Sequence, residues 1–371
     1  MRTRTRAAVL GSTSLAAIGL VACTVANGLI IPPTPATVDA GDGGDGCEHA
    51  FLPARPIEPD GFVDPPLVFA MDHVAFGSKD GGSSVGFDLD NSCTCAPHAG
   101  TCTPRSGAPE HCDAPGGRDN TIAAVTGTFT GPFNIEDYMN RRLKEGSAGM
   151  LIVISGYNGL ADDANVSISF LPSAGRLTLL PDGGTEAITD GGLRWSYDPN
   201  FDQKLNLANA IQILGYVKDH VAVAISNGAA TLPLAGLDLG FSKGFIVAPI
   251  KMNPPRIEDG VLGGRWPIDS IAASVGRFSL DNFGVPGKIC ETDFFTEKLI
   301  PQICATADIS ANEGDDNKGK PCDALSVAIS FSASPAEKGD PVPLAPVESC
   351  GADGRDAGDG GQPVALHVVC P

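Results

Sequence analysis

Alternation of apolar and small polar residues is the feature that most constrains this fold, because a period of two places successive side chains on opposite faces of a strand. The pattern occurs at 166–170, 326–331 and 364–369. Each of these segments predicts a strand with one buried face. Two denser apolar runs, Met150 to Ile154 and Val221 to Ile225, predict strands that are covered on both faces.

The rest of the pattern places these strands in a mainly β domain. The 46 glycines and 30 prolines punctuate the chain often enough to separate many short strands. We expect only three helices, over Ile135 to Lys144, Pro267 to Val275 and Phe294 to Ile300, and we expect Pro301 to stop or kink the last one. Many strands without a βαβ rhythm predict an antiparallel β-sandwich of jelly-roll or laminin-G-like type over residues 61–371.

The N-terminus has the features of an export signal. Three arginines precede an uncharged stretch, Ala7 to Ala22, that is too short to cross a bilayer as a helix. The segment Leu20-Val21-Ala22-Cys23 resembles the lipobox of bacterial lipoproteins, which implies that residues 1–22 are removed and that Cys23 carries acyl chains such as palmitate. An ordinary signal peptide cut near Ala22 or Ala26 is the alternative. Cys23 is followed by Thr24 and not by an aspartate, which in lipoproteins of this kind implies sorting to the outer membrane.

Residues 23–60 read as a flexible tether between this anchor and the domain. Proline-rich and then Asp/Gly-rich sequence offers little apolar surface to bury, so it stays solvated and extended. Asp39, Asp42 and Asp45 are three residues apart, whereas an EF-hand calcium loop needs acidic residues two apart. The acidic run is therefore interpreted as tether rather than as an ion site.

The net charge limits the classes of partner. The chain has 25 Lys and Arg against 44 Asp and Glu, a formal charge of −19. Such a field repels phosphate backbones and excludes nucleic acid as the expected partner. It favours solubility and can attract divalent cations.

The cysteine count supports export. There are 11 cysteines, and setting Cys23 aside leaves an even number that an oxidising compartment would pair. The disulfide candidates are Cys47, Cys93, Cys95, Cys102, Cys112, Cys290, Cys304, Cys322, Cys350 and Cys370. Four of them lie in a Cys-rich loop at 91–120, and others lie in a C-terminal region at 288–371. A zinc site around Cys93, Cys95 and His98 is the alternative, but the paired C-x-x-C spacing is missing.

The spacing of two cysteines bears on their pairing. A straight helix between Cys290 and Cys304 would separate them by about 20 Å, and a disulfide needs α-carbons within about 7 Å. Unless Pro301 folds the segment sharply, we expect each to pair elsewhere, with Cys322 a candidate partner for one of them.

The strongest candidate site is a group of carboxylates beside the Cys-rich loop. Asp88 and Asp90 project to one side of a strand, and the chain returns at Asp119 and Asn120. Carboxylate and amide oxygens are calcium ligands, so these four residues predict a calcium site. Two alternatives remain open: turn-forming side chains that cap their own backbone, and a pair of carboxylates for glycosidase chemistry.

Two other motifs suggest chemistry. Trp195 and Tyr197 share one strand face and would form a sugar-stacking platform if exposed, or core if buried. Gly240-x-Ser242-x-Gly244 matches a nucleophile elbow, but that motif needs a following helix. The residues after Gly244 predict a strand, so we interpret Ser242 as a turn residue and assign no catalytic residue.

Several of these motifs together resemble uncharacterised lipoproteins of large-genome Gram-negative bacteria. They are the lipobox, the tether, Asp88-x-Asp90-x-x-Cys93-Thr94-Cys95 and Gly156-Tyr157-Asn158-Gly159; the body loosely resembles concanavalin and laminin-G sandwiches. We therefore expect an exported, membrane-anchored binding module for a glycan or a protein partner. The alternatives are a secreted carboxylate-dependent hydrolase and a purely structural envelope protein.

Overall fold

The computed structural model describes residues 48–57, 65–77, 85–94, 100–105, 112–127, 134–189, 192–202, 211–226 and 228–345, together with Cys350, Val368 and Cys370. The strands are β1 (Leu67–Ala75), β2 (Gly149–Ser155), β3 (Asp163–Ser173), β4 (Leu177–Leu179), β5 (Thr185–Ala187), β6 (Arg194–Tyr197), β7 (Ile211–Lys218), β8 (Val221–Ile225), β9 (Ala230–Leu234), β10 (Leu237–Phe241), β11 (Lys243–Met252), β12 (Pro255–Pro267), β13 (Ala324–Pro335) and β14 (Glu337–Pro341). The α-helices are α1 (Ile122–Thr126), α2 (Ile135–Glu145), α3 (Ile268–Gly276) and α4 (Ile300–Thr306). Short helical turns are η2 (Pro199–Phe201), η3 (Leu280–Phe283), η4 (Ile289–Glu291), η5 (Phe295–Leu299) and η6 (Glu313–Asp315).

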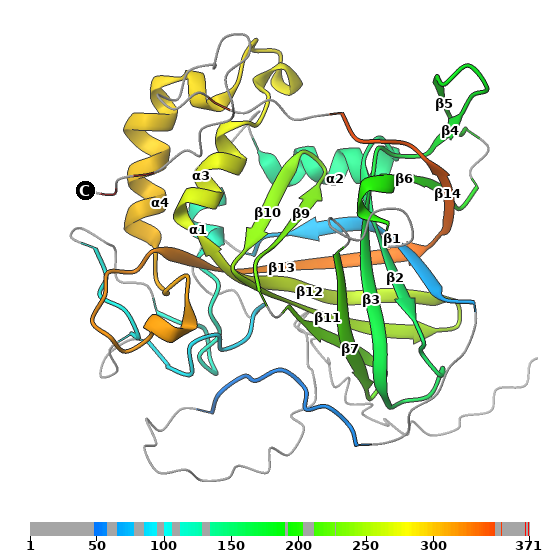
Figure 1. Ribbon diagram of the computed structural model, residues 1–371. Helices are drawn as coiled ribbons and strands as arrows, with labels where there is room; N and C mark the ends of the chain where they lie inside the picture. The colour runs from blue at the N-terminus through cyan, green and yellow to red at the C-terminus, as the bar shows by residue number, and fades with distance from the viewer. Residues whose placement is uncertain are drawn as a thin grey trace, which may run out of the picture.

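Eight antiparallel strands close into a barrel, in the order β1-β13-β12-β11-β8-β7-β3-β2 (Figure 1). The predicted sandwich is therefore wrong. An alternating pattern indicates only that one face of a strand is buried, and strands of sandwiches and of barrels both have one buried face. Closure depends on β1, which pairs with β13 on one side and with β2 on the other, as in Ala70↔Ser334 and Ala70↔Leu151. These partners are far apart in sequence, so local patterning does not reveal them.

The strands and helices themselves agree well with the patterns. The predicted strands at 166–170, 326–331, 150–154 and 221–225 lie in β3, β13, β2 and β8. The predicted helices at 135–144 and 267–275 are confirmed as α2 and α3. The segment at 364–369 lies outside the described residues except for Val368.

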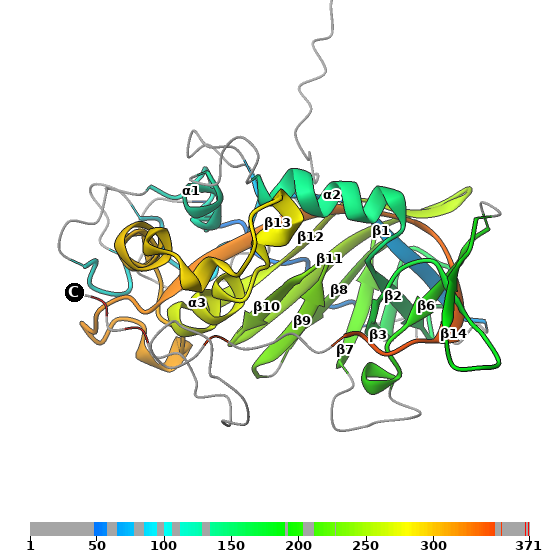
Figure 2. The ribbon, with the colours of Figure 1, turned by 90° about the horizontal axis from the view of Figure 1, so that it is seen from above.

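Helix α2 covers the barrel wall beside β1 (Figure 2). Asn134 caps its first turn by accepting from the Asp137 amide, and Gly146 ends it in the left-handed conformation. Asn140 donates to and accepts from the backbone of Val74, both at 2.8 Å. These bonds satisfy backbone groups of β1 next to the register shift between Met71 and His73.

A two-stranded hairpin and a helical layer close one end of the barrel. Hairpin β9–β10 packs between the barrel and α3, with Leu232, Leu234 and Leu239 fully buried. The third predicted helix corresponds to the π-helical turn η5, which runs directly into α4, so Pro301 does not stop it but occupies the first turn of α4. Proline is tolerated there because the first-turn amides have no partner within the helix.

Two apolar layers cover the outside of the barrel. Tyr197 and Trp195 on β6 pack over Leu151 and Leu171 of β2 and β3. On another part of the wall, Leu52 packs against a cluster that includes Tyr216 of β7. We call residues 48–57 the N-terminal strap, because they lie along the barrel without joining its sheet.

Three disulfides fasten the loops and the C-terminal region. They join Cys102 to Cys322, Cys290 to Cys350 and Cys304 to Cys370, with α-carbons 5.1, 6.4 and 5.6 Å apart. Cys290 and Cys304 thus pair elsewhere, as expected, but Cys322 is the partner of neither. Cys93 and Cys112 are also disulfide-bonded, which leaves neither as a zinc thiolate. Cys23, Cys47 and Cys95 lie outside the described residues, and so does the predicted tether except for residues 48–57, which form the N-terminal strap on the barrel.

Candidate metal centre

Three segments that are distant in sequence meet at the end of the barrel that carries α1, α3 and α4 (Figure 1). The Ala50 amide of the strap donates to the Gly116 carbonyl at 2.7 Å, and the Asp88 amide donates to the Ala50 carbonyl at 3.1 Å. The Asp119 amide donates to the Phe87 carbonyl at 3.2 Å. These backbone bonds bring the Asp88 and Asp119 segments together beside the strap.

The meeting point holds a group of buried carboxylates, which we call the carboxylate cluster: Asp88, Asp90 and Asp119. One oxygen from each lies within 4.8 Å of the others. Their exposed fractions are 9%, 6% and 3%. The structure therefore brings together three of the four residues that the sequence assigned to a calcium site.

Asn120, the fourth, has a different role. Its side-chain amide donates to the Ala328 carbonyl at 2.9 Å and accepts from the Ala328 amide at 3.0 Å. This pair of bonds fastens the loop to β13. The Asn120 side chain therefore bonds to the barrel wall and is not a member of the carboxylate cluster.

Backbone and hydroxyl groups hold each carboxylate in position. Asp88 accepts from the Asn91 amide at 2.7 Å, Asp90 from the Thr101 hydroxyl at 2.6 Å, and Asp119 from the Leu89 amide at 2.6 Å. Bonds of this kind also occur in ordinary turns. These bonds hold the carboxylate oxygens in place, but they do not supply a positive charge to balance ionised carboxylates.

Burial makes that charge unfavourable. It is the main cause that raises the pKa of Asp90, and it raises the pKa of Asp119 well above the usual range, with the charge of Asp90 adding to the effect. Two neighbours behave alike: burial raises the pKa of Asp113 to about 7 and that of Asp308 to about 6. Desolvation and like charges both favour a proton or a cation at this place.

Two positively charged or chargeable side chains adjoin the cluster. The His49 ring of the strap contacts the Asp88 carboxylate. Arg265, which is 2% exposed, donates to the Leu89 and Ser310 carbonyls at 2.7 and 2.8 Å. Its guanidinium also binds both oxygens of Asp316, at 2.9 and 2.7 Å. Because Asp316 pairs with Arg265 directly, that cation offsets little of the charge on the cluster.

The chemistry of the donors matches a hard divalent cation. Calcium takes oxygen ligands at about 2.3–2.6 Å, so two of its ligands on opposite sides lie about 4.8 Å apart. The three carboxylate oxygens lie within 4.8 Å of one another, so one calcium ion could contact all three. Carboxylate oxygens without sulfur or imidazole donors disfavour zinc and copper.

The other sequence candidates lie elsewhere and are not open sites. Tyr197 is 8% exposed and packs with Trp195 on the barrel wall. Lys338 lies over the Tyr197 ring, 4.0 Å from its centroid. The two aromatic rings therefore belong to the covering layer, and the exposed sugar platform is not formed.

Ser242 does not sit at a nucleophile elbow. It lies between strands β10 and β11, and its hydroxyl donates to the Ala311 carbonyl at 2.5 Å. A strand follows it, as the sequence predicts, and no helix lifts the side chain into a cleft.

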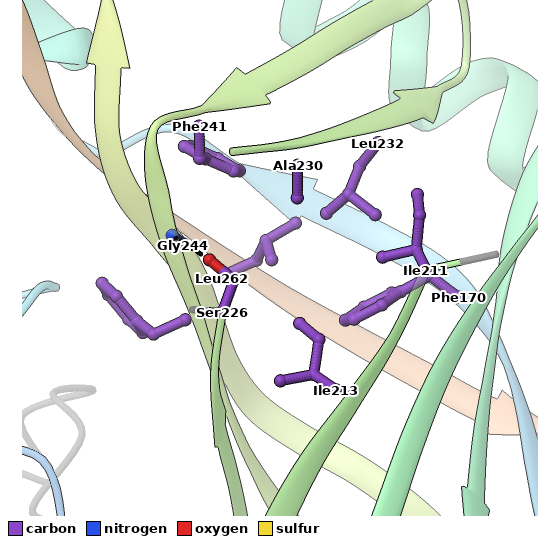
Figure 3. Close-up of a pocket in the computed structure, with 10 residues that line it drawn as sticks. Phe170, Ile211, Ile213, Ser226, Ala230, Leu232, Phe241, Gly244 and Leu262 are labelled. Atoms are coloured by element: carbon purple, nitrogen blue, oxygen red, sulfur yellow. Dashed lines mark hydrogen bonds between the residues drawn. The ribbon is translucent and has the colours of Figure 1, made fainter. Parts of the chain in front are cut away.

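A hollow at the barrel mouth is lined almost entirely by apolar side chains (Figure 3). Its one hydroxyl, Ser226, donates to the Gly228 carbonyl at 2.9 Å and accepts from the Gly244 amide at 2.7 Å. The space that a water-sized sphere can occupy is about 10 Å³, which is about enough for a single water molecule. None of the clustered carboxylates lines this hollow, so it gives no support to a hydrolase.

Sequence reasoning missed His49, Asp308 and Arg265 as neighbours of the cluster. Each reaches it from a different part of the chain, and no spacing rule connects them. Asp308 is linked to the loop through Thr121, whose hydroxyl donates to its carboxylate at 2.9 Å. Only the folded barrel places these residues together.

The chain matches no protein-family model, and no curated protein and no solved structure is significantly similar to it. Among the helices of the described residues, none combines the length and the hydrophobicity needed to cross a bilayer.

Proposed function

We propose that the protein is an exported, lipid-anchored binding module whose carboxylate cluster takes up calcium. One observation carries the proposal: three buried carboxylates place oxygens within 4.8 Å of one another. Binding of the ion fastens the loop at 85–94 to the loop at 112–121 and thereby completes the disulfide-stapled end of the barrel.

The physical case rests on desolvation. An ionised carboxylate that is buried without a cation is strongly unfavourable, and such a group takes up a proton or binds a metal. Calcium in an extracytoplasmic compartment would supply the charge without requiring protons. The rival hydrolase needs carboxylates that face a cleft, whereas these three are less than a tenth exposed.

Thermal unfolding of the purified chain tests the ion site. At a calcium concentration of about one hundred times Kd, binding contributes about 2.7 kcal/mol, which raises Tm by roughly 5 °C. Magnesium should act more weakly, because it demands a stricter geometry and retains its water. An absence of any calcium-dependent shift against EDTA would contradict the proposal.

A pair of variants makes this test specific. Asp119→Asn keeps the shape of the side chain but removes one charge, so the calcium response should disappear while the calcium-free protein is at least as stable as before. Asp163→Asn is the matched control, because Asp163 is also fully buried but is the first residue of β3, where its carboxylate accepts from the Asn158 amide. Its calcium response should persist, whatever its effect on stability.

The anchor is tested separately. Cells that express the chain with labelled palmitate should yield labelled protein, and Cys23→Ala should abolish the label. An unlabelled wild-type protein would instead favour the ordinary signal peptide.

A further inference from the structure

We propose that calcium binding at the carboxylate cluster controls the docking of the N-terminal strap on the barrel wall. The inference rests on the proposed calcium site and adds a regulatory consequence to it. It is carried by a set of contacts that the cluster shares with the strap.

Asp88 belongs to both parts. Its carboxylate is a member of the cluster and contacts the His49 ring of the strap. Its backbone amide donates to the Ala50 carbonyl at 3.1 Å. The other bond of Ala50, from its amide to the Gly116 carbonyl at 2.7 Å, goes to the loop that carries Asp119. The strap therefore bridges the same two loops that the ion would bridge.

Beyond Ala50, Leu52 packs against the apolar cluster that contains Tyr216, and the rest of the strap is attached by polar contacts with β7. The Tyr216 hydroxyl donates to the Pro53 carbonyl. Arg55 donates to the Gly215 carbonyl at 3.3 Å and lies over the Tyr216 ring, 5.4 Å from its centroid. The strap has no place in the barrel ladder, and Phe51 and Ile57 are largely exposed. A segment of this kind opens at low free-energy cost, so a modest change at one end shifts its docking.

The direction of the coupling follows from charge. An ion held between the Asp88 and Asp119 carboxylates joins the two loops to which Ala50 is bonded. Without the ion that link is missing, and the first anchor of the strap is weaker. A bound ion draws the loops together and favours docking. Linkage is reciprocal, so a loosened strap must weaken calcium binding by the same factor.

The strap also sets the length of chain that is free between the proposed anchor and the barrel. From Cys23 to His49 a fully extended chain reaches roughly 85 Å, and from Cys23 to Leu67 roughly 145 Å, at about 3.3 Å per residue. Calcium would thus shorten the tether, and loss of calcium would lengthen the reach of the barrel from the membrane.

Hydrogen exchange on the full chain in detergent measures the docking. With calcium, the amides of Ala50 and Asp88 should exchange at least about fivefold more slowly than with EDTA. Exchange in the barrel strand β3 should not change, because its amides are held in the barrel ladder with β2 and β7. Calorimetric titration of the same sample gives the calcium Kd.

Two strap variants that leave the carboxylates untouched test the reciprocity. Tyr216→Phe removes the hydrogen bond to the Pro53 carbonyl. Arg55→Ala removes the contact between Arg55 and the Tyr216 ring, and it replaces the first variant if Tyr216→Phe folds poorly. Each should raise the calcium Kd by about fivefold. Tyr157→Phe is the matched control, since its hydroxyl bonds the Leu160 carbonyl within its own loop, and it should leave Kd unchanged.

The outcomes separate the two proposals. If calcium does not bind at all, the proposed function fails. If calcium binds but exchange at Ala50 does not change, and both strap variants keep the wild-type Kd, the ion site stands and the control of the strap is overturned.

Discussion

The barrel interior and the carboxylate cluster are equally buried, yet different forces hold them. Ile152, Ile168 and Ile246 are fully buried in the apolar core, where stability grows with the area removed from water. Asp119 is nearly as buried, but its environment raises its pKa. From this comparison we expect one part of the molecule to be insensitive to pH and ions and the other part to respond to both.

The largest effect is expected in the apolar part. Trp266 is 1% exposed, packs beside Phe241, and donates to the Ser270 hydroxyl at 3.1 Å. Trp266→Ala should lower the free energy of unfolding by about 3–5 kcal/mol, because it leaves a cavity in the apolar core. Denaturant unfolding measures this loss. It should be the same with calcium and with EDTA, and a calcium-dependent loss would break the comparison.

A smaller effect is expected at the boundary between the two parts. Arg265→Met keeps the apolar stem but removes the guanidinium that Asp316 and the Leu89 and Ser310 carbonyls share. The free energy of unfolding should fall by about 1.5–3 kcal/mol, since the hydrogen bonds of a charged group are lost. The double variant Arg265→Met, Asp316→Leu replaces both partners and should recover part of the lost free energy of unfolding. Equal losses in the single and double variants would show that the ion pair is not the cause.

The free energy of unfolding should depend on pH through the polar part of the molecule alone. The pKa values of Asp113 and Asp308 are raised to about 7 and about 6, whereas an unfolded aspartate titrates near 3.9. Between about pH 4 and 7 the folded protein keeps protons that the unfolded chain has released. The stability of the calcium-free protein should therefore fall as pH rises through this window and level off above it.

Unfolding in EDTA at pH 5 and at pH 7.5 checks the sign. The variant Asp113→Asn with Asp308→Asn should show a shallower slope than the wild type. A wild-type protein that is more stable at pH 7.5 than at pH 5 would contradict the assignment. Stabilisation by calcium should run the other way, being lost as pH falls, because the metal needs ionised carboxylates.

The smallest effect is expected on the bare part of the barrel wall. Leu214 on β7 is 77% exposed. Leu214→Ser should change the free energy of unfolding by less than about 0.5 kcal/mol, with no change in the calcium response. A larger loss in solution would indicate that another surface covers this residue.

Local features were predictable because neighbouring residues decide them. Period-two alternation located β3 and β13, and the end signals of α2, Asn134 and Gly146, lie within the helix ends themselves. Closure of the barrel was not predictable, because it requires β1 to meet β13 across the whole chain. The same separation hid His49, Asp308 and Arg265.

The candidate site was predictable in part for a related reason. Asp88 and Asp90 are two residues apart, but they lie in a bend rather than on the predicted strand, and the Asp88 carboxylate accepts from the Asp90 amide. Asp119 follows from the return of the Cys-rich loop. The sequence alone could not separate Asn120 from them, because its alternative partner, the Ala328 backbone, lies in β13.

By itself the sequence determined strands, most helix positions, the residues able to ligate a hard cation and the number of cysteines available to pair, since these follow from residue type and short-range spacing. The tertiary structure decided that the strands close into a barrel, that Tyr197 is buried and Trp195 half-buried, and that three carboxylates converge in a buried place. Those properties depend on which distant segments share a surface, and the free energy of that choice belongs to the whole chain rather than to any stretch of it.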